Sequence, residues 1–319
     1  MDIFSIILWP IKWVIELILV AFHSLWTFVG LPFEAGITWV LSIVGLVIVV
    51  RAALIPIFVR QIKSQRRMLE VAPQLKKIQD KYKGKKDQFS REAMSRETMD
   101  LYKRTGTNPL SSCLPLLLQM PIFFGLFSVL NDASRNAERG GVGVLTPELA
   151  ESFANATFLG APLKATFIEA MNAGGPWQVM VVAVVMIILM TASQFITQLQ
   201  IVSKNMSPET KASPMFRQQR ILLYLLPLVF AVSGVAFPLG VMFYWLVSNF
   251  WTMGQQFIVI RNMPTPGSEA AKAREARLAK KGKLVVDGPT DGTASEEPEK
   301  KTTQRQQPVS KNRAKKKRK

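Results

Sequence analysis

The residue that most directly suggests chemistry is Arg51, because it lies inside a long apolar run. The run from Gly36 to Val59 is long enough to cross a bilayer and has no other charged residue. Arg51 precedes Arg60 by nine residues, about 13 Å along a helix, which is farther than an arginine side chain reaches. We therefore expect the guanidinium to lie at bilayer depth, where a charge needs a partner or a wet cavity.

No acidic partner for Arg51 is found in the other apolar runs. These runs cover residues 113–130, 177–199, 221–237 and 240–260, and none of them contains Asp or Glu. Their polar side chains are neutral and include Gln119, Gln194, Gln198, Tyr244 and Asn249. A guanidinium among amides, hydroxyls and water keeps its charge and stays available to an acidic ligand. The alternative is a structural arginine that is bound by backbone carbonyls beside Pro56.

Residues typical of enzymes and metal sites are scarce in this chain. It has one cysteine, Cys113, and one histidine, His23, which excludes a disulfide framework and histidine-rich metal sites. No GxSxG, GxGxxG or P-loop motif occurs. A membrane-embedded hydrolase or transferase needs a nucleophile with a base, or paired carboxylates, and the acid-free runs offer neither. We therefore expect no enzymatic activity, no metal and no cofactor.

Composition and apolar runs indicate an all-α polytopic membrane protein. The chain has 319 residues, of which 49% are hydrophobic, and a net charge of +18. The five apolar runs predict a five-helix transmembrane core over residues 36–260. Residues 1–30 are predicted to form an amphipathic interfacial helix, because Lys12, Glu16, His23 and Thr27 share one stripe. The alternative is a sixth span with this stripe turned inward.

Charge asymmetry predicts the orientation in the membrane. Residues 60–112 carry 14 Lys/Arg and 6 Asp/Glu, whereas residues 131–176 carry 3 Lys/Arg and 5 Asp/Glu. Because positive loops remain in the cytoplasm, residues 60–112 are expected inside and residues 131–176 outside. The protein is thus predicted to be a multi-pass protein of a bacterial plasma membrane with a cytoplasmic C-terminus.

The cytoplasmic segment 60–112 is predicted to be a helical hairpin. Apolar residues recur at steps of three and four on both sides of a break at Lys83–Asp87. They are Met68, Val71, Leu75, Ile78, Tyr82, Met94, Leu101 and Tyr102. The break is rich in lysine, which keeps the tip in water or at a polar surface.

The C-terminal segment 261–319 is predicted to be a disordered basic tail. It has 17 Lys/Arg against 7 Asp/Glu, and its periodicity is limited to a short helical piece around Glu269–Lys283. Such an arm suits an anionic surface, and the two candidates are ribosomal RNA and the headgroups of the lipid bilayer.

Three motifs in order along the chain resemble the YidC insertase family. Residues 108–123 read NPLSSCLPLLLQMPIF, residues 205–208 read NMSP, and residues 237–249 read FPLGVMFYWLVSN. Together with the arginine of the first core span and the charged hairpin, they extend the resemblance over roughly residues 9–261. The absence of a large domain before the core, and of a lipobox cysteine, favours a member from a single-membrane bacterium.

The resemblance implies a hydrophilic groove that is open to the cytoplasm and lipid and closed outside. It implies that Arg51 is the groove arginine, which draws acidic extracytoplasmic segments of clients partway across. By motif position, Met120 and Phe123 contact the client from the second span, and Tyr244 and Trp245 form the aromatic pair of the last span. The implied partners are nascent membrane proteins and the ribosome through the basic tail, and the protein is expected to work either alone or with the Sec translocon.

Two other functions compete with this membrane insertase and chaperone. A channel or secondary transporter with Arg51 as an anion site would favour internal repeats and paired broken helices, and no such repeat occurs. The membrane-embedded hydrolase or transferase lacks its acids. The insertase is therefore the predicted function.

Overall fold

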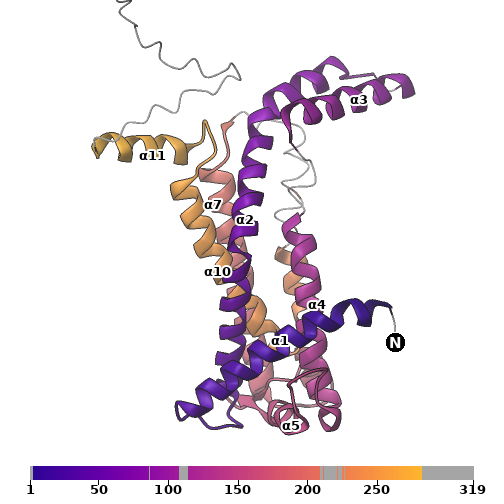
Figure 1. Ribbon diagram of the computed structural model, residues 1–319, viewed down its shortest axis with the longest axis vertical. Helices are drawn as coiled ribbons and strands as arrows, with labels where there is room; N and C mark the ends of the chain where they lie inside the picture. The colour runs from indigo at the N-terminus through magenta and orange to yellow at the C-terminus, as the bar shows by residue number, and fades with distance from the viewer. Residues whose placement is uncertain are drawn as a thin grey trace, which may run out of the picture. The chain divides into compact units, whose positions relative to one another are not determined.

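The computed structural model describes residues 3–85, 87–107, 114–208, 211, 221, 225 and 227–281. Its elements in chain order are α1 (Ile3–Phe28), α2 (Gly36–Lys81), α3 (Gln88–Thr105), α4 (Leu114–Arg135), the 3-10 helix η2 (Ala137–Arg139), α5 (Pro147–Asn155), β1 (Thr157–Phe158), β2 (Ala161–Pro162), α6 (Phe167–Asn172), α7 (Trp177–Lys204), α10 (Leu239–Asn262) and α11 (Glu269–Lys280) (Figure 1). Residues 227–234 are also helical.

The predicted all-α polytopic membrane fold is confirmed. Within the described ranges, four helical segments are long and apolar enough to span a membrane: Leu8–Phe28, Gly36–Ser64, Leu117–Arg135 and Trp177–Lys204. α10 occupies the predicted run 240–260 and has 24 residues, but it is not among these four, because polar residues interrupt its apolar sequence. Two short strands, β1 and β2, are the only strands in the described residues.

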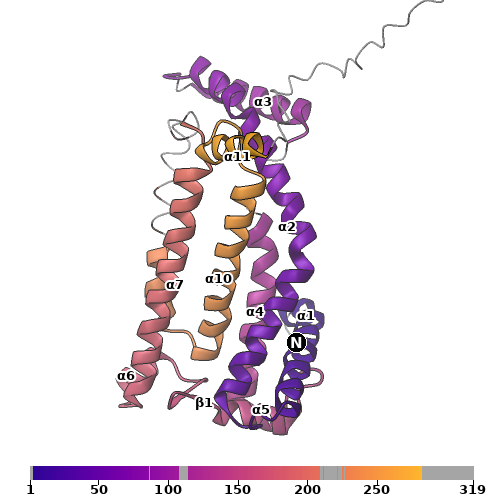
Figure 2. The ribbon, with the colours of Figure 1, turned by 90° about the vertical axis from the view of Figure 1, so that its left-hand side faces the viewer.

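The long helices pack around α10, which contacts α7, α2 and α4, while α1 contacts α2 and α4. α1 crosses α2 obliquely, whereas α7 and α10 run beside each other (Figures 1 and 2). Two glycines allow the close approach of α1. A Cβ on Gly45 would lie 2.5 Å from the Phe22 ring, and a Cβ on Gly125 would lie 3.0 Å from Ile11 and Ile15. α1 is therefore a packed part of the bundle.

The first core span continues without a break into the first arm of the hairpin. α2 has 46 residues, about 69 Å at the rise of an α-helix, and it runs through Pro56 and Pro73. The charge boundary at Arg60 predicted where the membrane part ends, but the helix itself does not end there. The turn of the hairpin follows Lys81, and α3 begins at the N-cap Asp87, whose carboxylate accepts a hydrogen bond from Ser90 N. We call this end of the bundle the hairpin end.

The opposite end of the bundle is formed by residues 136–176, and we call it the loop end. It contains η2, α5, α6 and an antiparallel pair in which Phe158 faces Ala161. The turn between the strands has positive φ at Leu159 and Gly160, as expected for a two-residue hairpin turn. α6 begins with a capping box of Thr166 and Glu169. This end is thus a folded cap.

Several sequence-based expectations fall outside the described residues. They concern residues 108–113 of the first motif, which include Cys113, residues 222–224 and 226 of the predicted run 221–237, and the tail from residue 282 onward. The helical piece predicted around Glu269–Lys283 is the helix α11, which ends at Lys280.

Candidate functional site

Arg51 lies in the membrane-spanning part of α2 and is half-buried. Its guanidinium carbon is 5.8 Å from the centre of the Phe58 ring, a favourable cation–π distance. Among the described residues, no carboxylate forms an ion pair with Arg51. The Phe58 ring therefore stabilises the charge of Arg51 but does not neutralise it.

Two polar side chains from other helices meet near Arg51. Tyr244 of α10 is 3% exposed, and its hydroxyl accepts a hydrogen bond from Gln119 Nε2 of α4 at 2.6 Å. The Tyr244 phenol is also close enough to Arg51 for an electrostatic interaction. We call these three residues the Arg51 cluster. It joins α2, α4 and α10 by groups that an acidic ligand could use as hydrogen-bond donors.

An aromatic cluster packs beside the Arg51 cluster, and its α4 members lie one and two helical turns nearer the loop end than Gln119. Its members are Phe123, Phe127, Phe230, Phe237 and Trp245. The Trp245 ring centre is 5.5 Å from Phe123, 4.6 Å from Phe230 and 5.8 Å from Phe237. Phe127 stacks on Phe123 at 6.5 Å and meets Phe237 edge to face at 6.1 Å. These contacts fill the space on the loop-end side of the Arg51 cluster with aromatic rings.

The remaining predicted site residues lie at the margins of this arrangement. Met120 is 39% exposed, and Gln194 borders a shallow crevice with Thr191 and Phe230. Gln198 is half-buried, and it forms no hydrogen bond with another predicted site residue in the described part of the chain. Asn249 Nδ2 is buried without a hydrogen-bond partner in the described part of the chain.

The buried face of α7 contains the residues that directly precede Gln194 and Gln198 in the sequence. Ser193 and Thr197 are buried, together with Met186 and Met190. Their hydroxyls donate to carbonyls of the same helix, namely Met190 O and Ser193 O. The spacing of the glutamines predicted one common face, and the structure puts that face at the edge of the buried surface.

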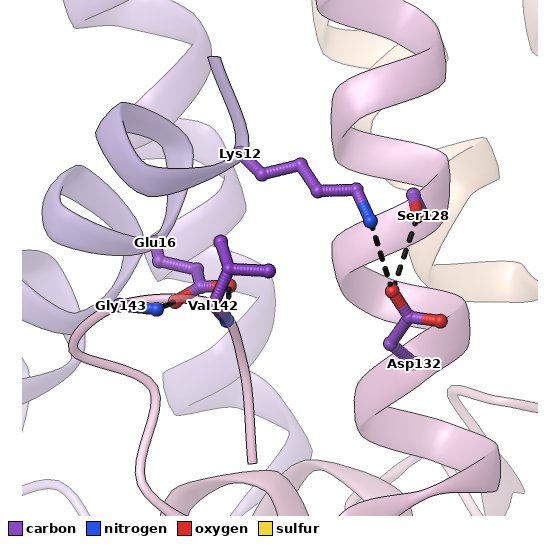
Figure 3. Close-up of polar contacts among 6 residues, drawn as sticks. All are labelled: Lys12, Glu16, Ser128, Asp132, Val142 and Gly143. Carbon is purple, nitrogen blue, oxygen red and sulfur yellow. Dashed lines mark hydrogen bonds and ion pairs between the residues drawn. The ribbon is translucent and has the colours of Figure 1, made fainter. Parts of the chain in front are cut away.

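Sequence reasoning did not find how α1 is attached to the loop end (Figure 3). Glu16 is 1% exposed, and its carboxylate accepts hydrogen bonds from Val142 N at 2.8 Å and Gly143 N at 2.7 Å. Leu145 N donates a third bond at 3.4 Å. A carboxylate held by several backbone N–H groups is a strong, charge-assisted arrangement. The glycines around residue 141 were the only sequence signal for such a backbone site.

A second attachment joins α1 to α4. Lys12 Nζ lies 3.2 Å from Asp132 Oδ2, which also accepts a hydrogen bond from Ser128 Oγ at 3.1 Å (Figure 3). The Lys12 side chain is 12% exposed. The polar stripe of α1 therefore faces the protein, as the alternative interpretation of this helix required. Its exposed side is apolar and includes Ile6, Trp9, Val14, Leu17 and Leu25.

A buried hydrogen-bond network completes the loop end. His23 Nε2 donates to Phe33 O at 2.9 Å, and Ser152 Oγ donates to the same oxygen at 3.0 Å. Trp39 Nε1 in turn donates to Ser152 Oγ at 3.1 Å. The His23 ring also packs on Trp39, with 4.2 Å between centroids. α1, α2 and α5 are thus connected through largely buried polar side chains.

The ion pair that joins the two arms of the hairpin near its tip is exposed. Glu97 accepts hydrogen bonds from Lys81 Nζ and from Tyr82 Oη, the second at 2.8 Å. The Lys81 ammonium, followed by the Tyr82 hydroxyl, lowers the pKa of Glu97, and the Glu97 hydrogen bond raises the pKa of Lys81. Both groups lie in water, so their interaction is screened.

No group of three or more His, Cys, Asp or Glu in the described residues could hold a metal ion. The predicted site residues Arg51, Gln119, Phe123, Tyr244 and Trp245 gather in the Arg51 cluster and the aromatic cluster, which together form the candidate site.

Comparisons with known proteins identify the family. The model of the family described as "60Kd inner membrane protein" matches residues 32–266. A relative named "Membrane protein insertase YidC" from Tropheryma whipplei (strain Twist) is 45% identical over 98% of this chain and 97% of the relative. One of the same name from Streptomyces avermitilis is 46% identical over 88% of this chain and 63% of the relative. One from Bifidobacterium longum is 36% identical over 97% of this chain and 95% of the relative.

The family match covers residues 32–266, which include every residue of the two clusters. The resemblance inferred from the three motifs is thereby confirmed. The chain belongs to the 60Kd inner membrane protein family, in which its relatives carry the name YidC.

Proposed function

We propose that the protein is a membrane protein insertase and chaperone, which receives hydrophobic segments of nascent membrane proteins and releases them into the bilayer. The observation that supports this most directly is the unpaired guanidinium of Arg51 in a membrane-spanning helix. Such a charge attracts acidic residues next to a client's hydrophobic segment and draws them partway across the membrane. The names of the relatives support the same activity.

The groove residues have separate tasks in this proposal. Arg51 binds a client carboxylate, and Gln119 and Tyr244 provide further hydrogen bonds. The apolar part of the client passes along side chains at the border between protein and lipid: Met120, Phe123, Gln194, Gln198, Trp245 and Asn249. The aromatic cluster borders the groove on the loop-end side with packed rings, so a client segment that moves beyond Arg51 must pass these rings. The activity makes and breaks no bond and uses no cofactor.

The loop end faces the outside of a bacterial plasma membrane in this proposal, and the hairpin end and the C-terminus face the cytoplasm. The 14 Lys/Arg of residues 60–112, against 3 in residues 131–176, favour this orientation. α1 lies obliquely in the outer leaflet, since its exposed side is apolar and its polar stripe is bound to the loop end. This assignment keeps residues 1–30 as an interfacial element outside the core 36–260.

The basic tail provides contact with the ribosome. Residues 261–319 carry 17 Lys/Arg, which suits ribosomal RNA, and the bilayer surface is the competing anionic partner. The protein works either alone or beside the Sec translocon.

Site-specific photocrosslinking during translation of a small membrane protein tests the proposed function. A crosslinker replaces Met120 or Trp245 in the groove, and the matched control replaces Ile188, which is 59% exposed on α7. We expect both groove positions to crosslink to the nascent chain, and the control position to crosslink to lipid. Crosslinks from Met120 and Trp245 to lipid alone would contradict the insertase and favour the transporter.

A further inference from the structure

A polar hollow of about 430 Å³ lies at the loop end, on the far side of the aromatic cluster from Arg51. Asn131 and Arg135 of α4 line it, and they continue the row of residues formed by Phe123 and Phe127 at steps of four. Pro238 also lines it, directly after Phe237 of the aromatic cluster. The hollow therefore begins one helical turn beyond the aromatic rings. We call it the basic hollow.

The charge of the basic hollow is unbalanced. Arg135 and Lys164 line it, and neither forms an ion pair with any residue that the structure describes. The one carboxylate in the lining is Glu169, which already accepts hydrogen bonds from Thr166 N at 3.3 Å and Thr166 Oγ1 at 3.0 Å. The nearby Asp132 is bound by Lys12. Two cations are thus available to an acidic group from outside the chain.

The hollow also offers neutral polar groups between these cations. The lining includes Asn131 and Ser134. Ser134 Oγ donates its proton to Leu130 O at 2.7 Å, so its oxygen can only accept a further bond. Asn131 retains an amide that can donate to a carboxylate. The chemistry of the basic hollow therefore suits carboxylates on a flexible segment.

We propose that the basic hollow receives the acidic extracytoplasmic segment of a client after this segment has passed the aromatic cluster. This inference rests on the proposed function, since it requires that clients leave Arg51 toward the loop end. The segment of α4 from Gln119 to Arg135 extends over 16 residues, about 24 Å along the helix, and it turns by about 40° around the helix axis at each step of four. It has a hydrogen-bond donor of the Arg51 cluster at one end and the cation of the hollow at the other. A client carboxylate that leaves Arg51 loses its attraction to that cation. Attraction to Arg135 and Lys164 beyond the aromatic cluster offsets this loss.

Continuity with the groove favours a client segment over an anionic lipid headgroup. The hollow begins one turn of α4 beyond Phe127 and beside Phe237, and it is an open hollow lined by α4, by residues from Pro162 to Glu169 and by Pro238 before α10. A headgroup would need no connection to the Arg51 cluster. Lipid binding is therefore an outcome that the test must be able to reveal.

Crosslinking at two positions of the full-length protein tests the proposal. A photocrosslinker replaces Asn131 in the hollow or Met120 in the groove, and translation of a client with an acidic N-terminal tail is stalled at increasing lengths. We expect the tail to crosslink to Met120 at short lengths and to Asn131 at longer lengths. Crosslinks from Met120 alone would overturn the basic hollow and leave the proposed function intact. Crosslinks from neither position would overturn both, and crosslinks from Asn131 to lipid alone would overturn the hollow as a client site.

Charge removal provides a second, independent test. Arg135→Gln and Lys164→Gln are compared with Arg139→Gln, which removes an exposed arginine of η2 that does not line the hollow. For a client with an acidic tail, insertion should fall about two- to fivefold for each charge removed, as expected for a solvent-accessible ion pair. The loss should be smaller at high salt and absent for a neutral tail. An equal loss for both tails, or no loss beyond that of the control, would overturn the proposal.

Discussion

The two ends of the bundle are held together by different kinds of contact. At the loop end, the groups that join α1 to its neighbours are buried, with Glu16 at 1% and the Lys12 side chain at 12% exposure. At the hairpin end, the Lys81 and Glu97 side chains of the ion pair are 57% and 37% exposed. Buried polar contacts resist local opening, whereas exposed ion pairs contribute little. We therefore expect the loop end to be the rigid end of the molecule and the hairpin end to be the part that moves.

Among the variants proposed for the loop end, Glu16→Ala is expected to cause the largest loss of stability. It leaves the N–H groups of Val142, Gly143 and Leu145 without their acceptor, and the loss of the buried acceptor for Leu145 N alone costs about 1–3 kcal/mol. We expect a lower midpoint of thermal unfolding in detergent and faster hydrogen exchange over residues 140–146. Glu138→Ala, in the exposed turn η2, is the matched control. Unchanged exchange in Glu16→Ala would mean that the buried carboxylate does not hold the loop.

A smaller effect is expected from Lys12→Ala and Asp132→Asn. The ion pair is partly exposed, with 40% of the Asp132 side chain accessible, so each variant should cost about 0.5–1 kcal/mol. A double-mutant cycle on the thermal stability of the protein isolates the pair, because both variants remove the same contact. Additive effects of the two substitutions would contradict the direct pairing of α1 with α4.

The stability of the hairpin should change with pH only at low pH, where Glu97 is protonated, and at high pH, where Lys81 loses its proton. The pKa of Glu97 is lowered by the Lys81 hydrogen bond, so this carboxylate stabilises the hairpin above its unfolded-state pKa of about 4.3 and loses that effect as pH falls. The pKa of Lys81 is raised, so its contribution is present below about 10.4 and is lost at higher pH.

Hydrogen exchange of residues 75–105 checks this prediction. After correction for intrinsic exchange, Lys81→Ala should differ from the wild type by a constant factor between about pH 5 and pH 9, because neither group titrates there. The loop end should show the same protection in both proteins. A change in protection near pH 7 would show that other groups control the hairpin.

Removal of the distal tail should leave the fold unchanged. The deletion should begin at Gly282, because Thr265 and Ser268 are buried and Thr265 N donates to Asn205 Oδ1 at 2.9 Å. The shortened protein should keep its thermal stability, yet bind ribosomes more weakly in a salt-dependent manner, since most of the tail's positive charge is lost. Co-sedimentation with ribosomes measures this, and equal binding of both proteins at moderate salt would exclude a ribosome contact of the tail.

The fold class was predictable because apolar runs of membrane length leave few alternatives to helices. The unpaired state of Arg51 followed from the same sequence, since the apolar runs contain no acid. The partners of Glu16 were not predictable, because they are backbone N–H groups of a loop that lies about 126 residues away in the chain. Side-chain patterns carry no information about such contacts.

The site was predictable to a similar degree. Phe123 and Phe127 lie four residues apart, which indicates a shared helix face, but the packing of Phe230 and Phe237 on Trp245 depends on tertiary structure. The position of Gln194 and Gln198 was less certain, because α7 is apolar on several sides and its buried face is defined by contacts with α10. Arg135 and Lys164 come from distant segments, and only the fold brings them into one hollow.

The most direct test of the central claim is the dependence of insertion on the charge at position 51. Arg51→Lys, Arg51→Ala and Arg51→Glu are compared in a depletion strain, with Arg60→Ala as an exposed control on the same helix. The client has either an acidic or a neutral extracytoplasmic tail. We predict that the acidic-tail client is inserted well with lysine, poorly with alanine and least with glutamate, and that the neutral-tail client is affected much less. Full insertion of the acidic-tail client by Arg51→Ala would contradict the proposed attraction.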